Sequence, residues 1–273
     1  FADVLQVKDV EVRAGARLLL SPVSFQVAAG DRVGLVGRNG AGKTTLTRIL
    51  AGEGLPAAGS VIRSGQLGYL PQDPRSGEPE QLARDRILGA RGLDQVMARL
   101  HRAEQQMSAA EGAERDKAMA AYARAETALL SAGGYAAEAE AARIAANLGL
   151  PERVLGQPLY TLSGGQRRRI ELARILFSDA DTLLLDEPTN HLDADSITWL
   201  RGYLQGFGGG LVVISHDVGL LEAVVNKVFH LDANRAELDL YAMDWKRYLQ
   251  QRETDEKRRR RERLNAERKA GAL

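Results

Sequence analysis

Short aliphatic runs separated by longer stretches of mixed polarity are the main pattern along this chain. Arg32–Val36, Leu183–Leu185 and Leu211–Ile214 have the length and composition of buried strands, and each run ends in polar residues. A glycine-rich turn and an apolar-periodic helix at Lys43–Leu50 follow the first run. Strands that alternate with helices indicate a largely parallel α/β sheet. Because ligands bind at the carboxyl ends of strands in such sheets, the polar residues there are candidate site residues.

The apolar spacing changes between residues 92 and 131. Apolar side chains recur there at helical intervals on either side of Gly112: Leu93, Val96, Met97, Leu100 and Met107, then Met119, Tyr122, Ala125 and Leu129. The spacing predicts two antiparallel helices of roughly 17 residues each, a hairpin over residues 93–130 that buries its own seam. Gly133 and Gly134 end the hairpin, and a further helix is expected over residues 136–148.

The last thirty residues form a separate, charged segment. From Trp245 onward the pattern is helical, and residues 252–269 carry nine basic and five acidic side chains, a local excess of +4. The segment has almost no apolar stripe, so it requires a partner or remains in water. We therefore divide the chain into a domain at residues 1–243, with the hairpin inserted at 93–130, and a helix at 244–273.

Composition narrows the class of protein. Of 273 residues, 44% are hydrophobic and 27% charged, which is typical of a globular protein, and the net charge of +1 gives no strong overall field. The absence of cysteine excludes disulfides, thiolate catalysis and cysteine-bound zinc. No apolar run approaches the ~20 residues that span a bilayer, and Phe1–Val4 do not begin a signal peptide. These features predict a cytoplasmic protein.

A phosphate-binding loop follows the first strand. The loop matches the G-x-x-x-x-G-K-[ST] pattern and continues one residue into the helix: Gly37, Arg38, Asn39, Gly40, Ala41, Gly42, Lys43, Thr44 and Thr45. Its glycines let backbone N–H groups converge on phosphate oxygens at a helix N-terminus. Lys43 would reach the β- and γ-phosphates and Thr44 would ligate Mg²⁺. The alternative, a glycine-rich turn before a helix, is weakened by the flanking strand and helix.

Two carboxylates end the second aliphatic run. Asp186 and Glu187 are adjacent on a strand and therefore point in opposite directions. Asp186 is the natural Mg²⁺ partner, and Glu187 is then placed to polarise the attacking water. Acidic residues also end many strands without any function, so this assignment depends on the phosphate loop.

A second glycine-rich helix start lies at Leu162–Gln166. Ser163 is a good N-cap, Gly164 and Gly165 expose backbone donors, and Gln166 precedes a basic and then apolar helix. One nucleotide does not need two phosphate cradles in one chain. Taken alone, the pattern favours an ordinary capped helix over a phosphate site.

Together these motifs resemble the ABC ATPase superfamily. Ser163, Gly164, Gly165 and Gln166 resemble its signature, which faces the γ-phosphate of ATP on a partner domain. By the same resemblance, Gln72 is the glutamine near Mg²⁺ and the attacking water, His216 is the histidine that contacts the γ-phosphate, and Asp193 couples the two sites. The resemblance implies an α/β P-loop ATPase domain with a helical subdomain, and ATP and Mg²⁺ as its ligands.

One position departs from that pattern. The family usually presents an aromatic ring to adenine before the first turn, but the segment here contains Arg13 instead. A guanidinium plane can stack on a base. Selectivity for ATP over GTP therefore stays open.

The segment Asp186–Asp193 points to one branch of the superfamily. Its Thr-Asn-His-Leu-Asp resembles ABC-F proteins, which are cytosolic translation factors and ribosome-protection antibiotic-resistance proteins. The hairpin at 93–130 lies where that branch carries an arm, and residues 244–273 resemble the start of its interdomain linker. The resemblance implies ribosomal RNA or tRNA as partners. It also implies a second ABC domain, in the same protein or as a second copy, because one signature and one phosphate loop are present.

Two other classes compete with this interpretation. The ATPase subunit of a membrane transporter would share every catalytic motif, but it would usually have a shorter helical insertion and no basic tail helix. A regulatory module without hydrolysis is disfavoured by Glu187 and His216. Because its signature serves a facing domain, the isolated chain is expected to be a weak ATPase.

Overall fold

The computed structural model describes residues 5–73 and 77–272. The predicted domain at 1–243 therefore begins, and the predicted helix at 244–273 ends, outside the described residues. Its element order is β1 (Leu5–Ala14), β2 (Arg17–Val27), β3 (Arg32–Val36), α1 (Lys43–Ala51), β4 (Ala58–Arg63), β5 (Leu67–Leu70), α2 (Ala83–Leu88), α3 (Leu93–Ala109), α4 (Ala113–Ser131), α5 (Gly134–Asn147), α6 (Glu152–Leu155), α7 (Gly164–Phe177), β6 (Thr182–Asp186), α8 (Ala194–Gln205), β7 (Gly210–Ile214), α9 (Val218–Val224), β8 (Lys227–Asp232), β9 (Glu237–Tyr241) and α10 (Trp245–Gly271). Short 3₁₀ turns lie at Gly89–Arg91 and Leu159–Thr161.

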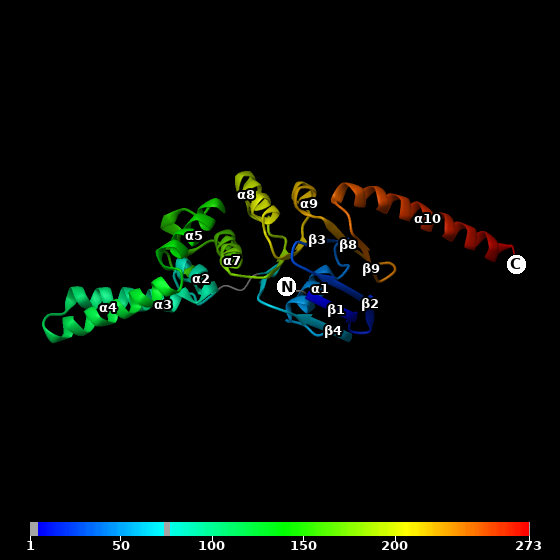
Figure 1. The fold of residues 1–273 in the computed structure, drawn as a ribbon. Helices are drawn as coiled ribbons and strands as arrows, with labels where there is room; N and C mark the ends of the chain where they lie inside the picture. The colour runs from blue at the N-terminus through cyan, green and yellow to red at the C-terminus, as the bar shows by residue number, and fades with distance from the viewer. Residues whose placement is uncertain (1–4, 74–76, 273) are drawn as a thin grey trace.

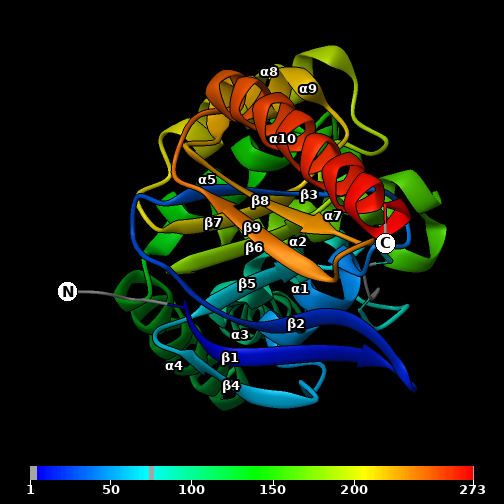
Figure 2. The ribbon, with the colours of Figure 1, turned by 90° about the vertical axis from the view of Figure 1, so that its right-hand side faces the viewer.

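A six-stranded sheet in the order β5-β6-β7-β3-β8-β9 forms the centre of the molecule. All of its neighbouring strands are parallel except β8 and β9. The three predicted strands β3, β6 and β7 are adjacent, so their carboxyl ends meet at one edge of the sheet (Figure 2). The predicted largely parallel α/β sheet is confirmed.

Each central strand is buried on both faces. Along β6, Leu183 and Leu185 belong to a core shared with the helices, whereas Leu184 belongs to a second core shared with β1, β2 and α1. Alternate side chains of a strand point to opposite faces, which explains why the run is aliphatic at every position.

The sequence pattern did not reveal an antiparallel sheet in the order β2-β1-β4. Its buried residues Leu5 and Val7 alternate regularly, but Val10 and Val12 follow with the alternation shifted by one position. Asp9 lies between them with φ 50°, where the strand pairing is irregular. This bulge conceals the period of two on which strand prediction depends.

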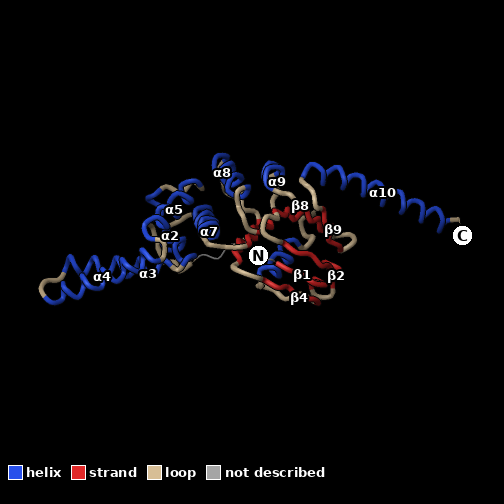
Figure 3. The backbone as a smooth tube through the Cα atoms, in the orientation of Figure 1, coloured by secondary structure: helices blue, strands red, loops and turns tan. Residues whose placement is uncertain are grey.

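Helices α2–α5, α7 and α8 lie to the left of the strands in Figure 3, whereas α10 extends to the right of them. The predicted hairpin is present as α3 and α4, and α5 spans residues 134–147 where 136–148 was expected. The hairpin is not wholly independent, because Leu93 and Leu129 at its base belong to the helical core. It projects from one end of the molecule and α10 from the other (Figure 1).

Candidate nucleotide site

The phosphate loop connects the carboxyl end of β3 to the N-terminus of α1. Gly40 and Gly42 have φ values of 80° and 106°, a backbone region that glycine adopts freely. A Cβ atom on Gly37 would lie 2.6 Å from the carbonyl oxygen of Leu231, so this position requires glycine. No side chain caps α1, whose N-cap is Gly42. Its first N–H groups are thus available to an anion.

A cavity of about 500 Å³ opens over this loop. It gathers residues that are distant in sequence, from the loop, from Gln72, from Asp186 and Glu187 at the end of β6, and from His216 after β7. Asn39, Gly40, Gly42, Lys43, Thr44 and Thr45 also line it. The structure therefore brings together most of the residues that the sequence predicted for a nucleotide site.

Lys43 brings a positive charge to the cavity wall. Its Nζ donates a hydrogen bond of 2.6 Å to the Gly37 carbonyl oxygen. Burial lowers the pKa of Lys43, while the charges of Glu187 and Asp186 oppose that shift. The side chain is therefore suited to bind an anionic group that enters the loop.

Thr44 and Asp186 form a pair of oxygen donors. The Thr44 hydroxyl donates to Asp186 Oδ2 at 3.0 Å. Burial raises the pKa of Asp186, and the Thr44 hydrogen bond opposes the rise. A hydroxyl and a carboxylate at this separation fit Mg²⁺, which prefers a few protein oxygens together with phosphate and water oxygens. Elsewhere in the described residues, no cluster of three His, Cys, Asp or Glu side chains could hold a metal ion.

Glu187 is buried and paired with the exposed ring of His216. His216 Nε2 lies 3.2 Å from Glu187 Oε1, and the His216 backbone N–H donates to Glu187 Oε2 at 3.4 Å. Burial raises the pKa of Glu187, and the charge and N–H of His216 oppose the rise. Glu187 also has φ 53°, which is uncommon for a residue with a side chain. The contacts with His216 thus hold the Glu187 carboxylate at the cavity, where it can accept a proton.

Sequence reasoning missed Arg168, which joins the catalytic segments. This side chain of α7 is 9% exposed, and its guanidinium donates to the carbonyl oxygens of Gln72, Asp186 and Glu187. Burial lowers the pKa of Arg168, and the charge of Asp186 opposes the shift. Helical periodicity could have found it, because Arg168 lies on the same face of α7 as the buried Leu172 and Ile175.

Four residues that were predicted to bind the nucleotide do not line this cavity: Arg13, Gly37, Arg38 and Ala41. The side chain of Arg13 contacts Glu11 and the Ala16 carbonyl oxygen, whereas Arg17 lines the cavity in its place. Arg38 lines a different cavity beside α10. Asn190, which the sequence did not single out, does line the nucleotide cavity.

The second glycine-rich helix start is also remote from the phosphate loop. Ser163 caps α7 in a reciprocal arrangement, in which its Oγ accepts from the Gln166 N–H and the Gln166 side chain accepts from the Ser163 N–H. Ser163 and Gly164 are exposed, and none of the four residues Ser163–Gln166 lines the cavity. The cap uses the N–H groups of Ser163 and Gln166, which leaves those of Gly164 and Gly165 in the first turn of α7 to serve a ligand held by another molecule or domain.

Comparison with known proteins finds one family and a group of longer relatives. A family model described as ABC transporter matches residues 20–190. The tylosin resistance ATP-binding protein TlrC of Streptomyces fradiae is 39% identical, over 84% of this chain and 42% of its own. The energy-dependent translational throttle protein EttA of Haemophilus influenzae is 36% identical, over 87% and 42%. The uncharacterized ABC transporter ATP-binding protein YfmM of Bacillus subtilis is 32% identical, over 90% and 48%. The chain thus spans less than half the length of these relatives.

Solved structures share the fold at lower identity. An ATP-binding subunit of an ABC transporter superposes with a TM-score of 0.63 and 21% identity, over 86% of this chain and 88% of that one. The dimeric bacterial ABC transporter cassette MJ0796 superposes with a TM-score of 0.60 and 20% identity, over 86% and 96%. At these identities the likeness concerns the fold alone.

Proposed function

The chain belongs to the ABC transporter family of ATP-binding domains, and from this membership we propose that it hydrolyses MgATP within an ABC-F protein that acts on the ribosome. The observation that carries the chemistry is the meeting of Lys43, the Thr44–Asp186 pair and Glu187 in one cavity. The ribosomal role is carried by the arm, the basic helix and the named relatives.

Each side chain of the cavity has a place in hydrolysis. Lys43 and the loop N–H groups bind the phosphates, while Glu187 accepts a proton from the attacking water. Thr44, Gln72 and Asp186 would hold Mg²⁺, which when bound neutralises charge on the phosphate oxygens. His216, whose Nε2 lies 3.2 Å from Glu187 Oε1, keeps that carboxylate in position, and by the resemblance it would contact the γ-phosphate.

The site requires a second domain. Ser163–Gln166 lie outside the cavity that holds Lys43, so we assign them to nucleotide on a facing domain. ABC domains form dimers, as in the MJ0796 cassette. The relatives are about twice as long as this chain, which is consistent with a second domain in the same protein. A second copy of the chain would serve the same purpose.

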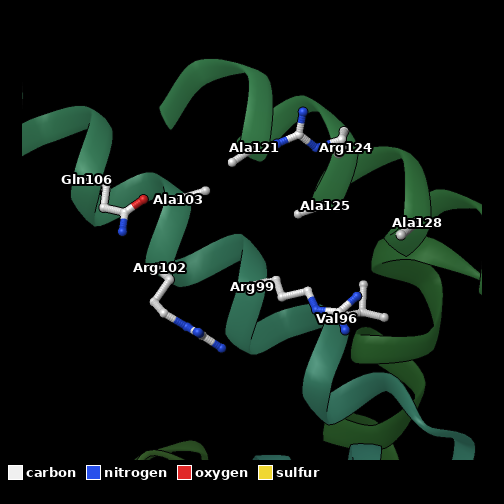
Figure 4. Close-up of a pocket in the computed structure, with 9 residues that line it drawn as sticks. All are labelled: Val96, Arg99, Arg102, Ala103, Gln106, Ala121, Arg124, Ala125 and Ala128. Atoms are coloured by element: carbon white, nitrogen blue, oxygen red, sulfur yellow. The ribbon is translucent and has the colours of Figure 1, made fainter. Parts of the chain in front are cut away.

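Two projecting elements support action on the ribosome. We assign residues 1–243 to the ABC domain, 93–130 to its arm and 244–273 to the start of an interdomain linker. On the arm, Arg99, Arg102 and Arg124 line a groove of about 370 Å³ between α3 and α4, a suitable surface for RNA phosphates (Figure 4). Relatives named for translational throttling and for tylosin resistance support the same role. Across residues 5–73 and 77–272, every helix is too short or too polar to cross a bilayer.

Ribosome co-sedimentation of the longest available form of the protein tests the proposal. Glu187→Gln should retain ATP binding, release no phosphate and pellet with ribosomes when ATP is present, because its amide cannot accept a proton from water. The parent should pellet less, since hydrolysis returns it to the free state. Recovery of both forms in membranes instead of the ribosome pellet would favour a transporter ATPase, the competing function.

A further inference from the structure

A second large cavity lies where α10 passes the β8–β9 hairpin. Its volume is about 750 Å³, and three separate parts of the chain line it: the phosphate loop, the β8–β9 turn and α10. Six of the lining side chains are arginines: Arg38, Arg235, Arg252, Arg259, Arg260 and Arg263. Among the lining residues only Asp232, Glu256 and Glu262 are acidic, so the cavity wall carries an excess of positive charge.

Two of these arginines are held by carboxylates and form the rigid floor. Arg235 Nε lies 3.0 Å from Asp232 Oδ2, and Arg252 Nη1 lies 2.7 Å from Asp239 Oδ2. Arg252 also reaches Asp232 at 3.2 Å, and Arg235 contacts Asp239. This network attaches α10 to the β8–β9 hairpin, and the two arginines neutralise the charges of Asp232 and Asp239.

The other arginines keep their charge available. Within the described part of the chain, Arg38, Arg260 and Arg263 make no ion pair within 4 Å. Arg259 makes only a 3.5 Å contact with Asp239 through Nη2, and its Nη1 is buried with no hydrogen-bond partner among the described residues. A buried guanidinium N–H that lacks an acceptor is costly, and an anion in the cavity would supply one.

The lining favours a phosphodiester backbone over a nucleotide base. Guanidinium groups bind phosphate oxygens through paired hydrogen bonds. The lining contains no Phe, Tyr or Trp ring on which a base could stack, and its one imidazole, His230, is hydrogen-bonded through Nδ1 to the Tyr248 hydroxyl at 2.7 Å. Contacts restricted to phosphates hold a strand without reading its sequence.

We propose that this cavity binds consecutive phosphates of a single-stranded RNA segment, an inference that rests on the proposed ribosomal function. Arg38 belongs to the phosphate loop, and the neighbouring Gly37 is in close contact with the Leu231 carbonyl at the end of β8. RNA in this cavity would contact Arg38, a loop residue that does not line the nucleotide cavity. The phosphate loop would then contribute residues to both cavities, Arg38 to this one and Lys43 to the other.

Fluorescence anisotropy of a labelled eight-nucleotide oligouridylate, titrated with the 273-residue chain at several salt concentrations, tests the proposal. The variant Arg260→Gln/Arg263→Gln removes two cavity charges that make no ion pair among the described residues. Its matched control, Arg258→Gln/Arg261→Gln, removes two charges from the same helix outside the cavity. Circular dichroism checks that α10 remains helical in both.

We expect the cavity variant to lose about two phosphate contacts. The slope of log K against log salt should then become shallower by about 1.4, which is on the order of 25-fold weaker binding at 0.1 M salt. The control should keep the parent slope, and Arg38→Gln should lose about one contact. Equal losses in both double variants would overturn the cavity in favour of a diffuse field. Cavity-dependent binding of polyglutamate without binding of RNA would overturn it in favour of an acidic protein partner.

This result can be separated from the ribosomal function itself. If the parent protein pellets with ribosomes but RNA binding is the same in both double variants, the cavity assignment fails and the ribosomal function stands. If RNA binding depends on the cavity but the protein does not pellet with ribosomes, the cavity stands as an RNA site and the ribosomal function fails.

Discussion

Replacing Arg168 with methionine removes the guanidinium that connects α7 to both catalytic segments while keeping a long side chain in the same space. The parent guanidinium makes three hydrogen bonds to backbone carbonyl oxygens, those of Gln72, Asp186 and Glu187. A hydrogen bond to a charged group contributes about 1.5–3 kcal/mol. Removing a buried charge recovers several kcal/mol of desolvation cost, so we expect a net loss of about 2–4 kcal/mol in the free energy of unfolding.

The same variant should separate catalysis from nucleotide binding. KM for ATP should change little, because among the described residues the hydrogen bonds of Arg168 go to backbone carbonyl oxygens outside the phosphate loop. The kcat should fall by about 10- to 100-fold, which corresponds to about 1.4–2.8 kcal/mol, as the Glu187 backbone relaxes from its φ of 53°. Urea unfolding and steady-state phosphate release measure the two effects.

Two controls decide the interpretation. Arg167→Met changes the exposed neighbour and should leave the free energy of unfolding within about 0.5 kcal/mol of the parent. Arg168→Lys retains the charge but not the fork, so it should restore stability more than kcat. A destabilised Arg168→Met that keeps the parent kcat would refute the positioning role and leave Arg168 purely structural.

Four further predictions concern the nucleotide site and the arm. Lys43→Ala should abolish ATP binding in calorimetry, and retained micromolar binding would contradict the loop assignment. Burial raises the pKa of Glu187, so kcat should fall on acidification at a higher pH than for an ordinary glutamate. The charge of His216 opposes that rise, so His216→Ala should move the acidic limb of the pH–rate profile to a still higher pH. Deleting residues 103–120 should preserve cooperative unfolding, whereas deleting 93–130 should destabilise the domain, because only the second deletion removes core residues at the hairpin base. Phosphate release per molecule should rise with protein concentration over a hundredfold range, and light scattering should report dimers at the upper end, because each nucleotide needs the signature of a facing domain. Constant activity from a monomer would contradict a site shared between two domains.

Local patterns were sufficient to predict the centre of the site. Lys43 and Asp186 are far apart in sequence, but each follows an aliphatic run, and parallel strands bring such ends to the same edge. The arm and the basic helix were also predictable, because their helical spacing is local.

Contacts that depend on packing were not predictable in this way. The role of Arg168 requires knowing that Gln72 and Glu187 approach α7 from two different strands. Arg38 lines the cavity beside α10 and not the nucleotide cavity, and no local pattern indicates that two such distant segments lie together. The shifted alternation at Asp9 conceals a sheet that only its pairing with β2 and β4 makes evident.

The attachment of α10 gives the molecule a mechanical lever. The helix is held at Arg252 by Asp232 and Asp239 and at Arg259 by Asp239, and beyond Arg259 it continues to Gly271 with exposed side chains. At 1.5 Å per residue, this unattached portion is about 18 Å long. A rotation of roughly 10° at Arg259 would displace the tip by about 3 Å, so a small adjustment beside the phosphate loop becomes a movement about as large as the 3.4 Å spacing of successive nucleotides at the far end.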